Sequence, residues 1–159
     1  MNLTPVITAP SDSAISAWRT TLDGIPDIRF RIGKMPAIAD GCDAAIVPAY
    51  LALDRYGGTP SREARVAENR RNDGLPSRIV VTPSYGPVAE KVENSDLSGP
   101  IQSVFTSCLR AVEEFNHLAV EQPIRTLLIH VVAIGFSAVD DIVIASAFRN
   151  AYHEARDMG

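Results

Sequence analysis

Short apolar segments alternate along this chain with longer amphipathic or polar segments, and this alternation constrains the fold more than any other feature. Four segments have the length and composition of buried strands: residues 3–8, 44–47, 79–82 and 127–133. Residues 28–32 alternate isoleucine or phenylalanine with arginine, which is typical of a half-buried strand near a sheet edge. Strands separated by helices usually form a parallel sheet covered on both faces. We therefore predict an α/β fold, a three-layer α/β/α sandwich around a mostly parallel, mixed central sheet.

Four helices are predicted between these strands. The first spans about residues 11–22, is capped by Ser11 or Ser13, and buries Trp18. The second is expected to begin at Thr59, with Pro60 in the first helical position, and to end near residue 72. Together with the two helices below, this gives the order β-α-β-β-α-β-loop-α-β-α.

The last two helices follow an irregular stretch, residues 83–99, which contains at most a short strand near Val88. Apolar residues at helical spacing predict a helix from Ile101 to Phe115. The final helix is expected to begin at Ser137, which forms a capping-box pattern with Asp140, and to end near residue 156.

Composition indicates one globular domain over residues 1–159. The hydrophobic fraction is 46%, which is ordinary for a globular protein. The net charge of -4 does not attract nucleic acid or an anionic membrane. No apolar run approaches the roughly 20 residues of a membrane span, and the first residues lack a secretory signal, so we expect a cytoplasmic protein. Cys42 and Cys108 are interpreted as buried or half-buried thiols. No His, Cys or carboxylate grouping has metal-ligand spacing, so neither a metal nor a cofactor is expected.

Two glycine-containing turns define the candidate site. One follows the strand at 44–47 and the other follows the strand at 127–133, and each is expected to open a helix. Ligands of parallel sheets bind beyond the carboxyl ends of the strands, and helix N-termini beside glycines suit phosphate. We predict a phosphate or diphosphate site there; the alternative is two ordinary tight turns. The predicted ligand-binding residues are Tyr50, Gly57, Gly58, Thr59, Ile134, Gly135, Phe136 and Ser137.

Several other residues admit two interpretations. Tyr50 and Phe136 could stack on a base or sugar, or could pack against the protein. An arginine-rich segment interleaved with glutamates indicates a solvated, ion-paired helix face rather than an anion-binding patch; its arginines are Arg62, Arg65, Arg70 and Arg71. His130 is expected to be buried and hydrogen-bonded, with no catalytic triad. Ser84 and Tyr85 could form a wall of the pocket.

From Trp18 onward, the order of these segments resembles the macro domains, an α/β family that binds ADP-ribose. Residues 43–49 are similar to the strand that enters the family's Asn-Ala-Ala-Asn segment. Gly57 and Gly58 fall at the place of its glycine-rich phosphate loop, and residues 127–136 resemble the strand and Gly-x-Gly-aromatic loop that covers the diphosphate. The resemblance implies a small-molecule partner, ADP-ribose or a related nucleotide diphosphate.

The chain departs from the family pattern at the residues that hold the rest of the ligand. Lys34 stands where the family has an adenine-binding aspartate, and Tyr50 stands where it has a ribose-binding asparagine. Thr59-Pro60 replaces the end of the family's Gly-Gly-Gly-Val-Asp segment, and Gly135 is the one glycine left in the second loop. The resemblance therefore implies a retained phosphate cradle with altered adenine and catalytic elements.

Two alternative functions remain open at this point. The scaffold could hydrolyse an ADP-ribosyl or related phosphoester bond, with Asp54 or Tyr50 acting on the substrate. It could instead recognise a protein partner or form a homo-oligomer, with Tyr50, Lys34 and Met35 filling the former ligand space.

Overall fold

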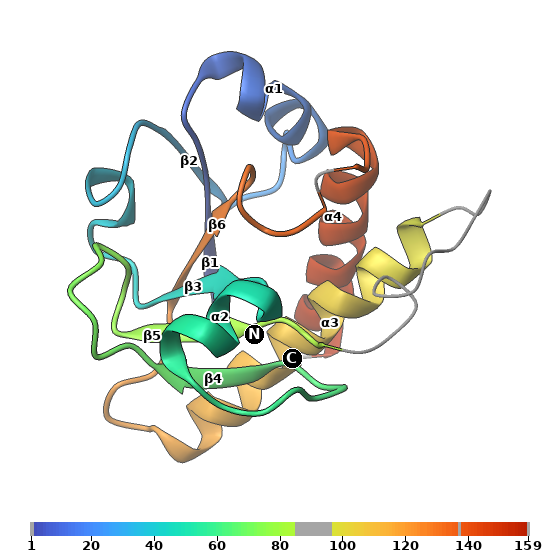
Figure 1. The fold of residues 1–159 in the computed structure, drawn as a ribbon. Helices are drawn as coiled ribbons and strands as arrows, with labels where there is room; N and C mark the ends of the chain where they lie inside the picture. The colour runs from blue at the N-terminus through green and yellow to red at the C-terminus, as the bar shows by residue number, and fades with distance from the viewer. Residues whose placement is uncertain (1, 85–96, 137, 159) are drawn as a thin grey trace.

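A six-stranded sheet forms the centre of the protein, seen in the computed structural model of Figure 1. The structure describes residues 2–84, 97–136 and 138–158. The order of strands across the sheet is β2-β1-β6-β3-β5-β4, and each neighbouring pair is parallel except β4 with β5. The strands are β1 (Thr4–Ala9), β2 (Arg29–Ile32), β3 (Ala44–Val47), β4 (Arg65–Glu68), β5 (Arg78–Val81) and β6 (Thr126–His130). The predicted mostly parallel, mixed sheet is confirmed.

Helices cover both faces of this sheet, as predicted. Three helices, α1 (Asp12–Thr21), α3 (Ser98–Leu118) and α4 (Asp141–Met158), pack on one face against a core that includes Ile7 and Ile46. In Figure 1, α4 lies beside both α1 and α3. The other face, which carries Ala45 and Val47, is covered by α2 (Ala49–Tyr56) and the short 3-10 helix η1 (Ala37–Ala39). The alternation of side chains along each strand divides the core between the two faces.

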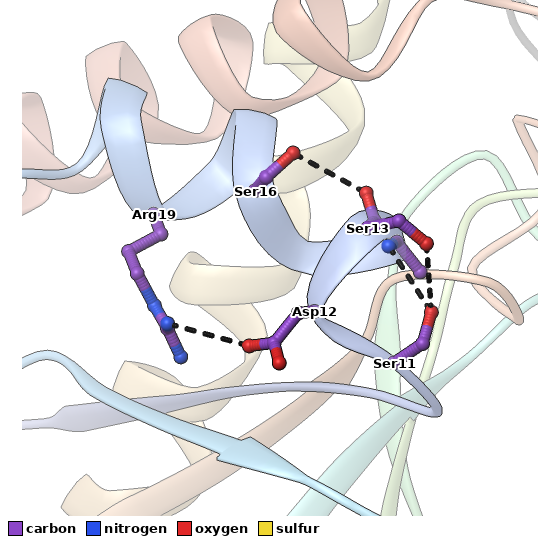
Figure 2. A network of polar contacts seen from close by, with 6 residues as sticks. Ser11, Asp12, Ser13, Ser16 and Arg19 are labelled. Atoms are coloured by element: carbon purple, nitrogen blue, oxygen red, sulfur yellow. Dashed lines mark hydrogen bonds and ion pairs between the residues drawn. The ribbon is translucent and has the colours of Figure 1, made fainter.

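The first helix follows its sequence prediction closely. Ser11 is the N-cap, and its Oγ accepts a hydrogen bond from the Ala14 N–H at 3.3 Å. Figure 2 shows this cap together with Ser13, which lies 3.1 Å from Ser11 Oγ, and the exposed ion pair between Asp12 and Arg19 at 3.8 Å. Asp12 near the N-terminus and Arg19 in the last turn both suit the helix dipole. The Ser11 cap therefore marks where α1 begins, and Leu22 is the C-cap at its other end.

The predicted helix over residues 59–72 is wrong. Residues 57–64 form a loop, and β4 follows it as an antiparallel edge strand whose Val66 and Ala67 pair with Val80 and Ile79. The helix of this region lies earlier, in α2, which starts after Pro48 and ends at Gly57. The reason is tertiary: strand pairing with β5 outweighs the local preference of Thr59-Pro60 for a helix start.

The last helix also begins later than its sequence prediction. α4 starts at Asp141, and the N–H groups of Val143 and Ile144 donate to the Asp140 carbonyl oxygen at 3.0 and 3.2 Å. Gly135 therefore does not lead directly into a helix. The proposed cap Ser137 lies outside the described residues, as does the short strand predicted near Val88.

A hydrogen bond joins the end of α2 to the connection between β4 and β5. Tyr56 Oη donates to Asp73 Oδ2 at 2.6 Å, and Asn69 Nδ2 donates to Asp73 Oδ1 at 3.0 Å. Burial raises the pKa of the Asp73 carboxyl, but the hydrogen bonds from Tyr56, Asn69 and the Leu75 N–H outweigh it and hold this pKa below its usual value. Burial and the same carboxylate raise the pKa of Tyr56 to about 12.

Replacing Tyr56 by phenylalanine is expected to lower the free energy of unfolding at pH 7 by about 1 kcal/mol, because it removes this hydrogen bond. A carboxylate whose folded pKa is lowered stabilises the protein above its unfolded pKa of about 4, and this stabilisation is lost as the pH falls through the folded pKa. The difference between wild type and variant should therefore narrow below about pH 4. Urea unfolding at several pH values measures it, with Tyr50→Phe as the exposed control. An equal loss at pH 7 and pH 3 would contradict this account.

Candidate functional site

A cavity of about 920 Å³ opens at the carboxyl ends of three neighbouring parallel strands, β6, β3 and β5. Pro48 follows β3, Thr82 follows β5, and Gly135 lies in the turn after β6; all three line the cavity. One wall comes from α3, and another comes from the loop before β4. The cavity thus lies at the edge of the sheet where ligands of parallel α/β sheets bind.

The N-terminus of α2 forms one side of this cavity. Pro48 precedes the helix, and the Ala49 N–H donates to the buried Thr82 Oγ1 at 3.0 Å, which ties α2 to the end of β5. The Tyr50 N–H donates no hydrogen bond to any described residue. Because Ala49 and Tyr50 both line the cavity, the positive end of the helix dipole and a free N–H lie at its wall.

The turn after β6 faces this helix end. Gly135 has φ +99°, and a Cβ placed on it would lie 3.2 Å from Pro48 Cβ and 3.8 Å from Tyr50 Cε1. Within the described part of the chain, the N–H groups of Gly135 and Phe136 have no acceptor. The turn therefore brings free N–H groups close to the α2 N-terminus, and glycine is what permits the close approach. Ile134, also predicted for the site, is buried and lines the cavity.

The two predicted aromatic residues both line the cavity. Phe136 is half-buried, and its ring meets that of Phe105 edge-on with centroids 5.9 Å apart. It therefore packs against the core and also forms a cavity wall, so the two interpretations of Phe136 are compatible. Tyr50 is 69% exposed, which leaves its ring accessible for stacking.

Sequence reasoning missed the polar wall formed by α3. Ser103, Ser107 and Arg110 line the cavity at helical spacing, and they could have been recognised as a polar stripe on an otherwise amphipathic helix. Arg62 and Glu63 line it from the loop before β4. Ser84 also lines the cavity, as proposed, whereas Tyr85 lies outside the described residues.

Gly57 and Gly58 occupy a different place from the one predicted. Gly57 ends α2 with φ +80°, and its N–H donates to the Leu53 carbonyl oxygen at 3.2 Å. Arg65 Nη2 donates to the Gly57 carbonyl oxygen at 2.8 Å. Within the described part of the chain, the cavity lining does not include Gly57, Gly58 or Thr59. The two glycines therefore end a helix rather than open one, and the predicted N-terminal phosphate turn is wrong on this point.

Several other candidates also fall outside the cavity lining that the described residues form: Lys34, Met35, Asp54 and Arg55. The arginine-rich segment is not a helix face, and Arg70 pairs with Glu68 at 3.0 Å on the surface. The interpretation of that segment as a helix is therefore wrong, while its exposed ion pair is confirmed.

His130, Cys42 and Cys108 differ in how deeply they are buried. The half-buried His130 Nδ1 lies 2.8 Å from Thr8 Oγ1, and burial lowers the pKa of the imidazole. The expected hydrogen bond of His130 is confirmed, whereas its side chain is half-buried rather than buried. Cys42 is half-buried and Cys108 is buried, both as free thiols. Burial raises the pKa of Cys108 to about 12, which suppresses its thiolate.

Metal-ligand clusters and membrane-spanning helices are both absent from the described residues. Among residues 2–84, 97–136 and 138–158, no group of three or more His, Cys, Asp or Glu side chains is placed to hold a metal ion. Over the same residues, no helix has both the length and the apolar character needed to cross a membrane. In comparisons with known proteins, the chain matches no family model and no curated protein.

Proposed function

We propose that this protein binds ADP-ribose or a related nucleotide diphosphate in the sheet-edge cavity, as a divergent macro domain. The observation that carries the proposal is the meeting of the Gly135 turn with the N-terminus of α2, where a Cβ on Gly135 would lie 3.2 Å from Pro48. Among the described residues, the N–H groups on both sides have no acceptor, so they can donate to an anion without losing a described protein partner.

The size and lining of the cavity support the same ligand class. Its volume of about 920 Å³ lies within the range of about 300–1,000 Å³ found for small-molecule sites. The rings of Tyr50 and Phe136 offer surfaces for a base or ribose, and the hydroxyl groups of Ser84, Ser103 and Ser107 offer partners for sugar hydroxyls. The lining thus combines an anion-binding end with aromatic and hydroxyl groups, as a nucleotide requires.

Calorimetric titration of the intact chain with ADP-ribose, ADP and adenosine tests the proposal. We expect ADP-ribose and ADP to bind with Kd values below about 1 mM, and adenosine to bind at least about tenfold more weakly because it lacks the diphosphate. An absence of heat from all three at millimolar concentration would overturn the proposal. Equal affinity for ADP and adenosine would overturn the role of the N–H groups.

A further inference from the structure

We propose that Thr82 is a positioning residue for the diphosphate: it caps α2 from the neighbouring strand and leaves the Tyr50 N–H as the donor that this helix offers to a phosphate. This inference rests on the proposed function and specifies how its anion-binding end is built. The N-cap residue of α2 is Pro48, whose side chain makes no capping hydrogen bond. A serine, threonine, aspartate or asparagine in that position would usually accept a hydrogen bond from the second or third N–H of the helix.

The four N–H groups in the first turn of α2 have different partners. The Ala49 N–H donates to Thr82 Oγ1 at 3.0 Å, so a hydroxyl group from the end of β5 caps the first donor. The N–H groups of the third and fourth helical residues both donate to the Pro48 carbonyl oxygen, at 3.0 and 2.9 Å. Of these four groups, only the Tyr50 N–H has no acceptor among the described residues. The start of α2 therefore offers a single N–H to a ligand.

Thr82 is held where its hydroxyl group can cap the helix. It follows β5 directly, it is buried, and its N–H donates to the Val47 carbonyl oxygen at 3.2 Å, which continues the pairing of β5 with β3. On the other side of β3, a Cβ on Gly135 would lie 3.2 Å from Pro48 Cβ and 3.8 Å from Tyr50 Cε1. The start of α2 is therefore held between the end of β5 and the turn after β6.

The Thr82 hydroxyl group matters to a ligand because it fixes the first turn of α2. Without it, the buried Ala49 would keep an N–H that has lost its acceptor, and the first turn would shift toward another one. Binding groups must be held to within about 0.5 Å of the productive geometry. A shifted turn would therefore cost the ligand the charge-assisted hydrogen bond from the Tyr50 N–H.

Calorimetry with ADP on the intact chain tests this role. Thr82→Val keeps the shape of the side chain but lacks the hydroxyl group, and it should bind ADP at least about tenfold more weakly than wild type. Thr82→Ser keeps the hydroxyl group and should bind within about threefold of wild type. Thr126→Val is the matched control, because Thr126 Oγ1 also accepts a backbone N–H, that of Asp43 at 2.9 Å, but at the amino end of β6. It should also stay within about threefold of wild type.

Nuclear magnetic resonance provides a second measurement, on wild type alone. When ADP is added to isotope-labelled protein, the Tyr50 amide proton should move downfield, because it donates to a phosphate oxygen. The Ala49 amide proton should move less, since it stays bonded to Thr82 Oγ1. These shifts decide the question where Thr82→Val does not fold.

The outcomes separate this inference from the proposed function. If Thr82→Val binds ADP as tightly as wild type, or if Thr82→Ser or Thr126→Val loses as much affinity as Thr82→Val, the role of Thr82 is overturned and the proposed function stands. A downfield shift of the Ala49 amide proton in place of that of Tyr50 overturns it as well. If wild type gives neither heat nor amide shifts with millimolar ADP, the proposed function fails and this inference fails with it.

Discussion

Replacing Trp18 by alanine is expected to lower the free energy of unfolding by about 3–5 kcal/mol, the usual cost of truncating a large buried aromatic residue. Trp18 is fully buried, and its ring lies 6.4 Å from that of Phe105 and 5.9 Å from that of Phe148. These rings belong to α3 and α4, so Trp18 joins α1 to both other helices on that face. For a domain of this size, the loss corresponds to a fall in Tm of roughly 10 °C.

The neighbouring residue provides the control for this prediction. Arg19→Ala removes an exposed side chain whose ion pair with Asp12 is 3.8 Å long, and it should cost less than about 1 kcal/mol. Trp18→Phe should cost less than Trp18→Ala, because the indole Nε1 is buried without a hydrogen-bond partner among the described residues. Urea unfolding of the three variants measures the series. A loss below about 1 kcal/mol for Trp18→Ala would contradict the packing of α1 against α3 and α4.

The substitution Gly135→Val is expected to weaken ADP-ribose binding by at least about thirtyfold, a loss of about 2 kcal/mol of binding free energy. A Cβ at this position would lie 3.2 Å from Pro48 Cβ, and the side chain would narrow the space between the turn and α2. Because Gly135 has φ +99°, valine is also strained there, at a cost of about 1–3 kcal/mol in stability. Calorimetry measures the affinity, and thermal unfolding measures the stability.

Gly57→Val is the matched control, because Gly57 has φ +80° and an added Cβ would meet nothing within 4 Å. It should lose stability by a similar amount and keep ADP-ribose affinity within about threefold of wild type. Comparing the two variants shows which of the two glycine turns predicted from the sequence contributes to ligand binding. If Gly57→Val lost binding and Gly135→Val kept it, the ligand site would lie at the end of α2 instead.

Most of the sheet could be predicted because its strands are contiguous apolar segments. β3 has the predicted bounds, Ala44–Val47, and the alternation of residues 28–32 indicated the edge position of β2. β4 could not be predicted, since it holds two charged residues and only Val66 and Ala67 as apolar residues. This segment is a strand because it pairs with β5, and the strand propensities of its own residues do not reveal that pairing. The boundaries of α2 did carry signals, Pro48 before the helix and Gly57 after it.

The candidate site was predictable where it depends on parallel strand ends. The rule that such ends share one edge brings Tyr50 and Gly135 together, and both line the cavity. Gly57 and Gly58 were misplaced because the helix beside them precedes them instead of following them. Arg62 lines the cavity because β4 pairs with β5 beside it, and the local sequence carries no signal for that pairing.

A crystal structure of the protein with ADP-ribose tests the central claim most directly. We expect the ligand to lie in the cavity between α2 and the Gly135 turn, with a diphosphate oxygen about 3 Å from the N–H nitrogen of Tyr50 or Gly135. The ring of Tyr50 or Phe136 should contact the adenosine or the distal ribose. A ligand bound elsewhere, for example beside Gly57 and Gly58, or an empty cavity at saturating ADP-ribose, would contradict the account.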